Sequence, residues 1–393
     1  MPDRNRLLSL TACLILTLGA SNALNAATFT VTNLDMSGPG SLRQAVDDAN
    51  ASAGADDIVF APGLTGTITP GSELVLSESV SVRGPGARLL AISGGNSSRI
   101  FRLDNAAAKT VTIADITLQS GSATGNGGAI LNSGGNLLLQ RVRIVGNTAT
   151  GDGGGIYNAF FPAGNALTIE DSEISGNRAD KQGALYFTGF ILRITNSTIS
   201  GNTALDSVGA IGLQFATAEI FNSSIVGNTA TFVGGMQVQA SQLTLESTLL
   251  ADNTDITGIN DINRMGSGTT SATASLFSED VNATSVLNGT NTGNRIGVAA
   301  GIGALADNGG PTDSHRLLAG SPAIGAGSNS QALAFDQRGS GFPRDAGGAT
   351  DIGAVERSNA PQPAPLAVPA MPLPALLTLV LLLGLLGMWR QRD

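Results

Sequence analysis

The acidic side chains in the middle of the chain are the groups whose chemistry best suits catalysis. A pair of carboxyl groups held a few ångströms apart, one with a shifted pKa, is what cleavage of a glycosidic bond requires. However, neighbouring residues of a strand point to opposite faces, so closeness in sequence does not pair them. We therefore expect solvated surface carboxylates, and no catalytic, metal-binding or cofactor-binding residues. The candidates considered are Asp152, Glu170, Asp171, Glu173, Asp180, Glu219 and Glu246.

Other reactive side chains are scarce. Lys109 and Lys181 are the only lysines, which leaves few bases for a lyase. His315 is the only histidine, and a lone histidine supports no catalytic triad, so we expect a structural role for it. The one cysteine, Cys13, lies in the predicted leader, so the mature chain has no disulfide.

A recurring phrase, an aliphatic residue followed two positions later by Gly-Asn or Asp-Asn, is the strongest pattern in the sequence. Its asparagines are spaced 30, 25, 26 and 25 residues apart. A fixed period of this length predicts a solenoid, in which each repeat is one turn. A side-chain amide both donates and accepts, and asparagine tolerates a left-handed corner, so we expect a structural ladder. The ladder would contain Asn147, Asn177, Asn202, Asn228 and Asn253.

Each repeat holds three short alternating segments and has no room for a helix. This pattern predicts an all-β fold, a single-domain right-handed parallel β-helix with three sheets. Residues 165–170 and 172–174 are two of these segments, and a Gly-Gly or Gly-Ala phrase opens the third. We interpret the paired glycines as allowing tight corners. One apolar file of the interior would contain Ile144, Ile174, Ile199, Ile225 and Leu249.

Residues 28–60 predict a module that covers the first turn. A strand over 28–32 precedes a helix that begins at Ser41, with Gln44 completing a capping box. Residues 28–95 resemble the start of bacterial surface β-helix proteins with a CSLREA-type N-terminal region. The apolar face of the helix would contain Leu42, Ala45, Val46 and Ala49.

Two phrases near the end of the regular repeats carry a second resemblance. Residues 307–327 (DNGGPTDSHRLLAGSPAIGAG) and 336–356 (DQRGSGFPRDAGGATDIGAVE) resemble the choice-of-anchor Q domain of bacterial β-helix proteins. The acidic residue usual in the Ser-Pro-Ala-Ile phrase is Gly325 here. The repeats themselves resemble those of polymorphic outer-membrane proteins. These resemblances imply surface location and anchoring, and no specific chemistry.

Both ends of the chain predict export. Arg4 and Arg6 precede an apolar run and small residues, so residues 1–27 are expected to be a signal peptide. Residues 358–374 form a Pro/Ala linker, and 375–393 a transmembrane or sorting tail with an apolar helix over 375–389. The layout resembles tails of the PEP-CTERM and IPTL-CTERM kind, some of which a sorting peptidase cleaves. We expect the cell envelope or surface, with the protein anchored or released.

Composition narrows the function. A net charge of −9 argues against nucleic acid. Between the ends we expect an N-terminal cap and first coils (28–100), regular coils (101–260) and irregular C-terminal coils (261–357).

The first hypothesis is a structural or adhesin-like surface protein whose partners are surface glycans or other surface proteins. The alternatives are a polysaccharide lyase or hydrolase of the pectate-lyase-like class, and a non-catalytic carbohydrate-binding module. The candidate contact loop holds Phe160 and Phe161.

Overall fold

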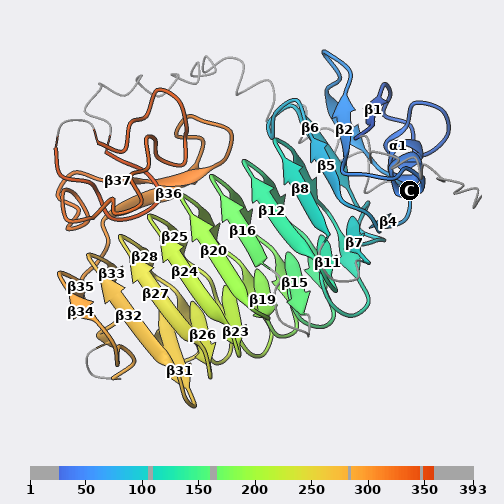
Figure 1. Cartoon of the computed structure of the whole chain (residues 1–393). Coiled ribbons are helices and arrows are strands. Elements are labelled where there is room, and N and C mark those ends of the chain that lie inside the picture. The colour runs from blue at the N-terminus through green and yellow to red at the C-terminus, as the bar shows by residue number, and fades with distance from the viewer. Residues whose placement is uncertain (1–25, 105–108, 160–165, 282–284, 346–347, 358–393) are drawn as a thin grey trace, which may run out of the picture. The chain divides into compact units, whose positions relative to one another are not determined.

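The computed structural model describes residues 26–104, 109–159, 166–281, 285–345 and 348–357. These residues form a parallel β-helix with one α-helix, which confirms the predicted solenoid (Figure 1). The leader up to residue 25, the Phe160–Phe161 loop, the linker 358–374 and the tail 375–393 lie outside the described residues. Within the described part of the chain, no helix is both long enough and apolar enough to cross a bilayer.

Three long sheets run along the stack, and we name them A, B and C. Sheet A has eleven strands: β1 (Thr28–Val31), β2 (Asp56–Phe60), β5 (Val80–Arg83), β8 (Thr110–Ala114), β12 (Asn136–Gln140), β16 (Ala166–Glu170), β20 (Ile191–Thr195), β24 (Thr217–Phe221), β27 (Gln242–Glu246), β32 (Thr269–Thr273) and β34 (Asn291–Thr292). Sheet B has ten: β3 (Gly66–Ile68), β6 (Leu90–Ser93), β9 (Thr117–Gln119), β13 (Arg143–Val145), β17 (Glu173–Ser175), β21 (Thr198–Ser200), β25 (Ser224–Val226), β28 (Leu249–Ala251), β33 (Leu276–Phe277) and β35 (Arg295–Ile296). Sheet C has eight: β4 (Leu74–Leu76), β7 (Phe101–Leu103), β11 (Ile130–Asn132), β15 (Ile156–Ala159), β19 (Leu185–Thr188), β23 (Ile211–Gln214), β26 (Met236–Gln239) and β31 (Ile262–Met265).

A fourth, short sheet, which we name D, was not predicted. It lies at the corner that follows each Gly-Asn phrase, between sheets B and C, and its strands have two residues each. Two further two-residue strands, β29 (Thr254–Asp255) and β30 (Gly258–Ile259), pair antiparallel after the regular repeats. Sheet D contains β10 (Ser122–Ala123), β14 (Thr148–Ala149), β18 (Arg178–Ala179) and β22 (Thr203–Ala204).

Pairing between neighbouring turns is parallel, so like side chains lie over one another in the interior. In sheet A, Leu137 pairs with Leu167, which pairs with Leu192, and all three are buried. In the apolar file of sheet B, Ile225 pairs with Leu250 rather than with the predicted Leu249, which instead pairs with Ser224. Counting back from each ladder asparagine places Leu250 in this file, because the position of the asparagine sets the register.

The repeated glycines reflect close contact between turns rather than corner geometry alone. A Cβ atom added to Gly183 would lie 2.3 Å from the carbonyl oxygen of Gly209, and one added to Gly209 would lie 2.3 Å from that of Gly234. Real Cβ atoms do not approach backbone this closely, so any side chain here would push the turns apart. The glycine file therefore keeps this corner of the coil thin.

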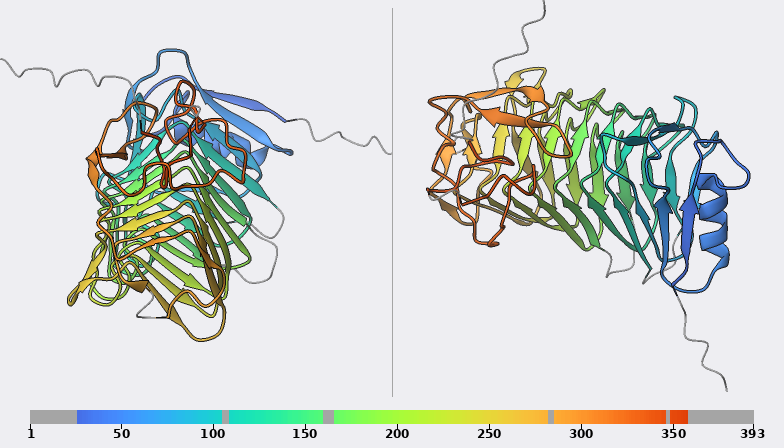
Figure 2. Two further views of the ribbon diagram at one scale, coloured as in Figure 1. Left: turned by 90° about the vertical axis from the view of Figure 1, so that its left-hand side faces the viewer. Right: turned by 90° about the horizontal axis from the view of Figure 1, so that it is seen from above.

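The N-terminal module covers one end of the stack, as predicted. Helix α1 (Leu42–Ala51) packs against β1, β2 and β4, and Figure 2 shows it at the end of the coil. The Ser41 hydroxyl accepts from the backbone N–H of Gln44 at 3.2 Å, so the predicted N-cap is present. The Gln44 side chain bonds Asp48 instead of returning to Ser41, so the capping box is incomplete. The predicted apolar face is buried: Leu42, Ala45, Val46 and Ala49.

The region predicted to be irregular coils, 261–357, has two different parts. Residues up to 296 still add strands to sheets A, B and C. Residues 300–345 and 348–357, which we name the C-terminal segment, do not continue the stack. They contain the antiparallel pair β36 (Ile302–Ala306) and β37 (Ser314–Leu317) and lie against the side of the coil (Figures 1 and 2). The prediction of further coils is therefore wrong for this segment, whose own hydrogen bonds are mostly turns.

Candidate functional site

The five predicted ladder asparagines lie in one buried file at the corner after sheet B. The Nδ2 of Asn147 donates to the Oδ1 of Asn177 at 2.9 Å, and the same bond joins each asparagine to the next as far as Asn253. Each acceptor oxygen also accepts from a backbone N–H of the turn before. The amides are fully buried, so they are structural groups and are out of reach of a ligand.

Two details of the ladder differ from the expectation. The left-handed residue is the glycine before the asparagine, with a φ of 63° at Gly146, and Asp252 takes that role before Asn253 with a φ of 58°. The ladder also has a sixth member, because the Nδ2 of Asn253 donates to the carboxylate of Asp261 at 2.8 Å. Asp261 is only eight residues beyond Asn253, so the 26-residue period could not reveal it.

The predicted surface carboxylates fall into different environments. Asp180 is exposed, and Glu219 pairs with Arg193 at 2.7 Å at the surface. Glu173 contradicts the expectation of a solvated side chain, since it is only 1 % exposed. Its carboxylate accepts from the Arg143 guanidinium at 2.7 Å and from the Asp313 backbone N–H at 3.0 Å. Burial of Glu173 is possible because the C-terminal segment covers this part of sheet B and supplies a donor.

The register of sheet A shows whether carboxylates from different turns can face one another. Glu170 pairs with Thr195, which pairs with Phe221 and then Glu246. Glu219 lies two positions earlier, in the file of Arg193. Two turns separate Glu170 from Glu246, and the Glu246 carboxylate accepts from the Ser330 hydroxyl at 2.7 Å. These residues therefore do not form a pair of facing carboxyl groups.

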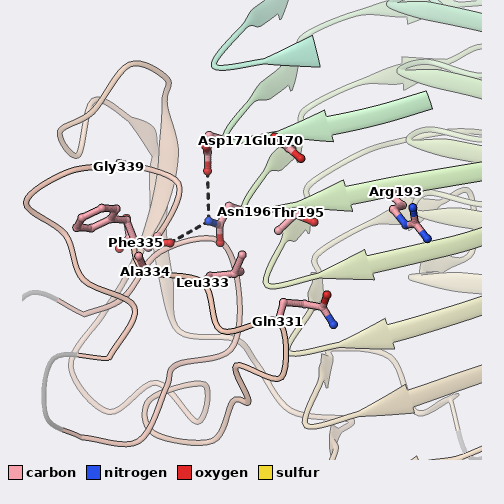
Figure 3. Close-up of a pocket in the computed structure, with 11 residues that line it drawn as sticks. Glu170, Asp171, Arg193, Thr195, Asn196, Gln331, Leu333, Ala334, Phe335 and Gly339 are labelled. Atoms are coloured by element: carbon pink, nitrogen blue, oxygen red, sulfur yellow. Dashed lines mark hydrogen bonds between the residues drawn. The ribbon is translucent and has the colours of Figure 1, made fainter. Parts of the chain in front are cut away.

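The best candidate site is a pocket of about 430 Å³ where the ends of β16 and β20 meet residues 331–339 of the C-terminal segment (Figure 3). Asp171 and Asn196 occupy matching corners with positive φ, and the Asn196 Nδ2 donates to the Asp171 carboxylate at 3.2 Å. The same Nδ2 donates to the Phe335 carbonyl at 2.9 Å. The lining residues are Glu170, Asp171, Arg193, Thr195, Asn196, Gln331, Leu333, Ala334, Phe335, Asp336 and Gly339.

The electrostatics of the pocket centre on Asp171. The pKa of Asp171 is raised from 3.8 to about 6, chiefly by burial and to a smaller extent by the neighbouring Glu170 charge. The Asn196 hydrogen bond, Arg141 and Arg344 lower it. Near pH 6 the carboxyl group is therefore partly protonated and can donate a hydrogen bond as well as accept one. The sequence named Glu170 and Asp171 as candidates, but nothing in it predicted the wall formed by residues 331–339.

The raised pKa predicts that Asp171 makes the fold pH-dependent. Asp171 binds its proton more tightly in the folded chain than in the unfolded one. The stability that this proton adds to the fold is therefore fully present below about pH 4 and is lost as the pH rises through 6. The loss should amount to about 2–3 kcal/mol of unfolding free energy. Replacing Asp171 with Asn should remove this part of the pH dependence, measured as melting temperature between pH 4 and pH 7.5. Asp180→Asn, an exposed aspartate of the same turn, is the control, and parallel curves for wild type and Asp171→Asn would contradict the prediction.

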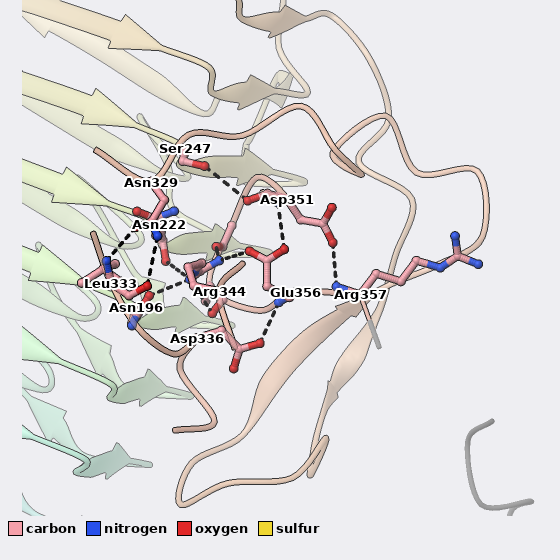
Figure 4. A network of polar contacts seen from close by, with 12 residues as sticks. Asn196, Asn222, Ser247, Asn329, Leu333, Asp336, Arg344, Asp351, Glu356 and Arg357 are labelled. Atoms are coloured by element: carbon pink, nitrogen blue, oxygen red, sulfur yellow. Dashed lines mark hydrogen bonds and ion pairs between the residues drawn. The ribbon is translucent and has the colours of Figure 1, made fainter. Parts of the chain in front are cut away.

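A buried polar network fastens the C-terminal segment beside this pocket (Figure 4). Arg344 is fully buried, and its guanidinium donates to the Asn196 Oδ1 at 2.6 Å and to the Glu356 carboxylate at 2.8 Å. It also donates to the Asn222 and Gly353 carbonyls, so one side chain joins two turns of the coil to the end of the segment. The pKa of Glu356 is raised to about 7, because the effect of burial outweighs the lowering effect of the Arg344 charge.

His315 has the structural role that we expected. Its Nδ1 lies 2.8 Å from the Gly303 carbonyl, which can only accept, so Nδ1 carries the proton. The Nε2 then accepts from the Ser200 hydroxyl at 2.8 Å. Burial lowers the pKa of the imidazole, which keeps it neutral in this position.

Aromatic side chains are divided between the interior and the surface. Phe187 belongs to the core and Phe190 is exposed. The rings of Tyr157 and Tyr186 stack on the outer face of sheet C, with centroids 5.2 Å apart and planes at 16°.

In the described part of the chain, no group of three or more His, Cys, Asp or Glu residues could hold a metal ion.

Comparison with known proteins adds little to this geometry. No family model matches the chain, and no curated protein matches it. Among solved structures, the crystal structure of pectate lyase Pel9A is similar at a TM-score of 0.41 and 14 % sequence identity, covering 86 % of this chain and 98 % of that one. At these values the likeness carries no argument about activity. The described fold defines the class, an all-β parallel β-helix protein with one α-helix.

Proposed function

We propose that the chain is an exported β-helix protein, held at the cell surface through its C-terminal end, with a structural or adhesin-like role. The observation that supports this role is the fastening of the C-terminal segment along the side of the coil. Arg344, Glu356 and their partners join the last residues before the linker to two turns of sheet A and sheet B. A force applied through the tail would thus be shared by the stack.

Several sequence features fit this proposal. The leader over 1–27 would export the chain, and the tail over 375–393 would hold it or be removed by a sorting peptidase. The phrases of residues 307–327 and 336–356 resemble the choice-of-anchor Q domain, and residues 28–95 resemble a CSLREA-type region. A long continuous core replaces disulfides as the source of stability outside the cell.

Cell fractionation with mass spectrometry of both mature termini tests the location. We expect the envelope or medium fraction to contain the protein, with an N-terminus near residues 22–28. A variant that ends at residue 374 should appear in the medium only. Recovery of the intact leader in the cytosol would contradict the proposal, and so would retention of the shortened variant in the envelope.

The pocket of Figure 3 favours a second candidate function, the cleavage of a polysaccharide. The observation that supports it is the Asp171 carboxyl group, whose pKa is raised to about 6 and which lines the pocket with Glu170 and Arg193. The test is incubation of the protein with a panel of polysaccharides, followed by assays for new reducing ends and for unsaturated products. Turnover that Asp171→Asn abolishes would support an enzyme, and absence of turnover across the panel would leave the non-catalytic role.

A further inference from the structure

From β11 to β31, the outward positions of the sheet C strands carry no charged side chain. The outward residues of this face are two tyrosines, amides and small or apolar side chains, although the chain as a whole carries a net charge of −9. The face is continuous over six turns, and the C-terminal segment lies against other corners. The outward residues are Leu131, Tyr157, Ala159, Tyr186, Thr188, Gly212, Gln214, Gln237, Gln239, Asn263 and Met265.

The tyrosine pair forms the centre of this face. Tyr157 and Tyr186 are register partners on β15 and β19, both half-buried, and their rings stack. The next turn has Gly212 at the same position, so no side chain of that file extends the stack. Aromatic rings with one polar end give a large, rigid contact area at low cost in conformational entropy.

Amide groups continue from the rings across the neighbouring strands. The Tyr186 hydroxyl donates to the Gln214 Oε1 at 2.6 Å, and the Gln214 Nε2 donates to the Gln239 Oε1 at 3.3 Å. Gln237 lies beside them on β26. Side-chain amides both donate and accept, which suits a partner that presents many hydroxyl groups.

A buried polar atom beside Gly212, the register partner of Tyr186, also lacks a partner. Gln182 lies across Gly212, since a Cβ atom added there would be 2.8 Å from the Gln182 Cγ. This glutamine is only 6 % exposed, and its Oε1 has no hydrogen bond within the described residues. A buried carbonyl oxygen without a donor is costly, so a bound hydroxyl group at this position would be favourable.

We propose that this face of sheet C, centred on Tyr157 and Tyr186, binds an uncharged polysaccharide. Sugar C–H groups would contact the rings, and sugar hydroxyls would bond the amides of Gln182, Gln214 and Gln237. An uncharged polysaccharide would thus be the ligand of the proposed adhesin-like protein, and the inference rests on that proposed function.

The charges around the rings explain why the ligand is uncharged. Burial raises the pKa of both tyrosines, and the nearby Asp152 charge adds to this shift. The same charge would repel an acidic polysaccharide. Lys181 is 4.0 Å from the Asp152 carboxylate and is partly neutralised by it. An apolar protein surface would leave the amides of the face without partners.

Intrinsic fluorescence offers a direct test, because Tyr157 and Tyr186 are the only tyrosines and Trp389 is the only tryptophan. In the full chain carrying Trp389→Phe, tyrosine emission reports this pair alone. We expect saturable quenching or enhancement with at least one neutral hexasaccharide of glucose, xylose, mannose or galactose. Hexagalacturonate should bind about tenfold more weakly or not at all. No response to any of the four neutral sugars would overturn the proposal.

Calorimetric titration of variants locates the site. Tyr186→Ala should weaken binding about tenfold, whereas Tyr186→Phe, which keeps the ring, should retain most of it. Phe335→Ala, on the wall of the other pocket, should bind normally. Circular dichroism and melting temperatures confirm that each variant is folded. Loss of binding in Phe335→Ala with no effect of Tyr186→Ala would place the sugar elsewhere and overturn the proposal. The assay is done in solution, so its outcome is independent of where the protein is located in the cell.

Discussion

Replacing Arg344 with methionine is expected to release the C-terminal segment while the coil stays folded. Arg344 is fully buried and donates to Asn196, Asn222, Gly353 and Glu356. Its loss leaves the Glu356 carboxylate without its cation and the buried Asn196 Oδ1 without its donor. Removing one partner of a buried ion pair costs about 3–5 kcal/mol, because the other group must stay charged without its partner or take up a proton.

Hydrogen–deuterium exchange read by mass spectrometry checks this prediction. Peptides from residues 312–345 and 348–356 should lose protection in Arg344→Met, and so should the edges of β17 and β21, which the segment covers. Peptides from sheet C should exchange as in the wild type. The matched control is Arg193→Met, whose side chain is 53 % exposed and pairs with Glu219. This surface pair should contribute less than about 1 kcal/mol. Equal effects of the two substitutions would contradict the explanation that buried Arg344 holds the C-terminal segment against the coil.

Replacing Asn202 with alanine is expected to destabilise the centre of the coil. The Asn202 Oδ1 accepts from both the backbone and the side chain of Asn177, and its Nδ2 donates to Asn228 and to the Ile174 carbonyl. Alanine would leave the Asn177 backbone N–H without its acceptor, and would remove one donor each from the Asn228 Oδ1 and the Ile174 carbonyl. Since an orphaned group costs about 1–3 kcal/mol and the other lost hydrogen bonds add to this cost, we expect a loss of about 4 kcal/mol or more.

Urea unfolding followed by circular dichroism measures this loss. Thr203→Ala is the control, because the neighbouring hydroxyl is partly exposed and its side-chain hydrogen bond, to the Thr229 hydroxyl at 3.2 Å, is a single one at the surface. It should cost less than about 1 kcal/mol. If Asn202→Ala does not fold, Asn147→Ala at the first rung of the ladder provides the measurement, with a smaller expected loss. Equal midpoints for Asn202→Ala and Thr203→Ala would contradict a stabilising ladder.

Contacts that repeat with the period could be predicted from the sequence. The asparagine file, the glycine phrases and the alternating strands recur about every 26 residues, and each copy contacts the same position of its neighbour. One copy therefore predicts the surroundings of the next. The same reasoning, anchored on aliphatic residues rather than on the asparagines, misplaced Leu249 by one position.

The candidate sites needed the tertiary structure. The wall of the Asp171 pocket and the burial of Glu173 come from contacts that join residues 312–356 to residues 171–247 across more than 100 positions of chain. Each such contact occurs once, so no period or local propensity encodes it. The tyrosine stack lies between these extremes, since the repeat aligns Tyr157 with Tyr186. Only the structure showed Gln214 at the Tyr186 hydroxyl and Gln182 against Gly212. The sequence pattern, which repeats about every 26 residues, therefore determines the coil. The sites depend on packing between segments that are far apart in the chain and have no sequence pattern in common.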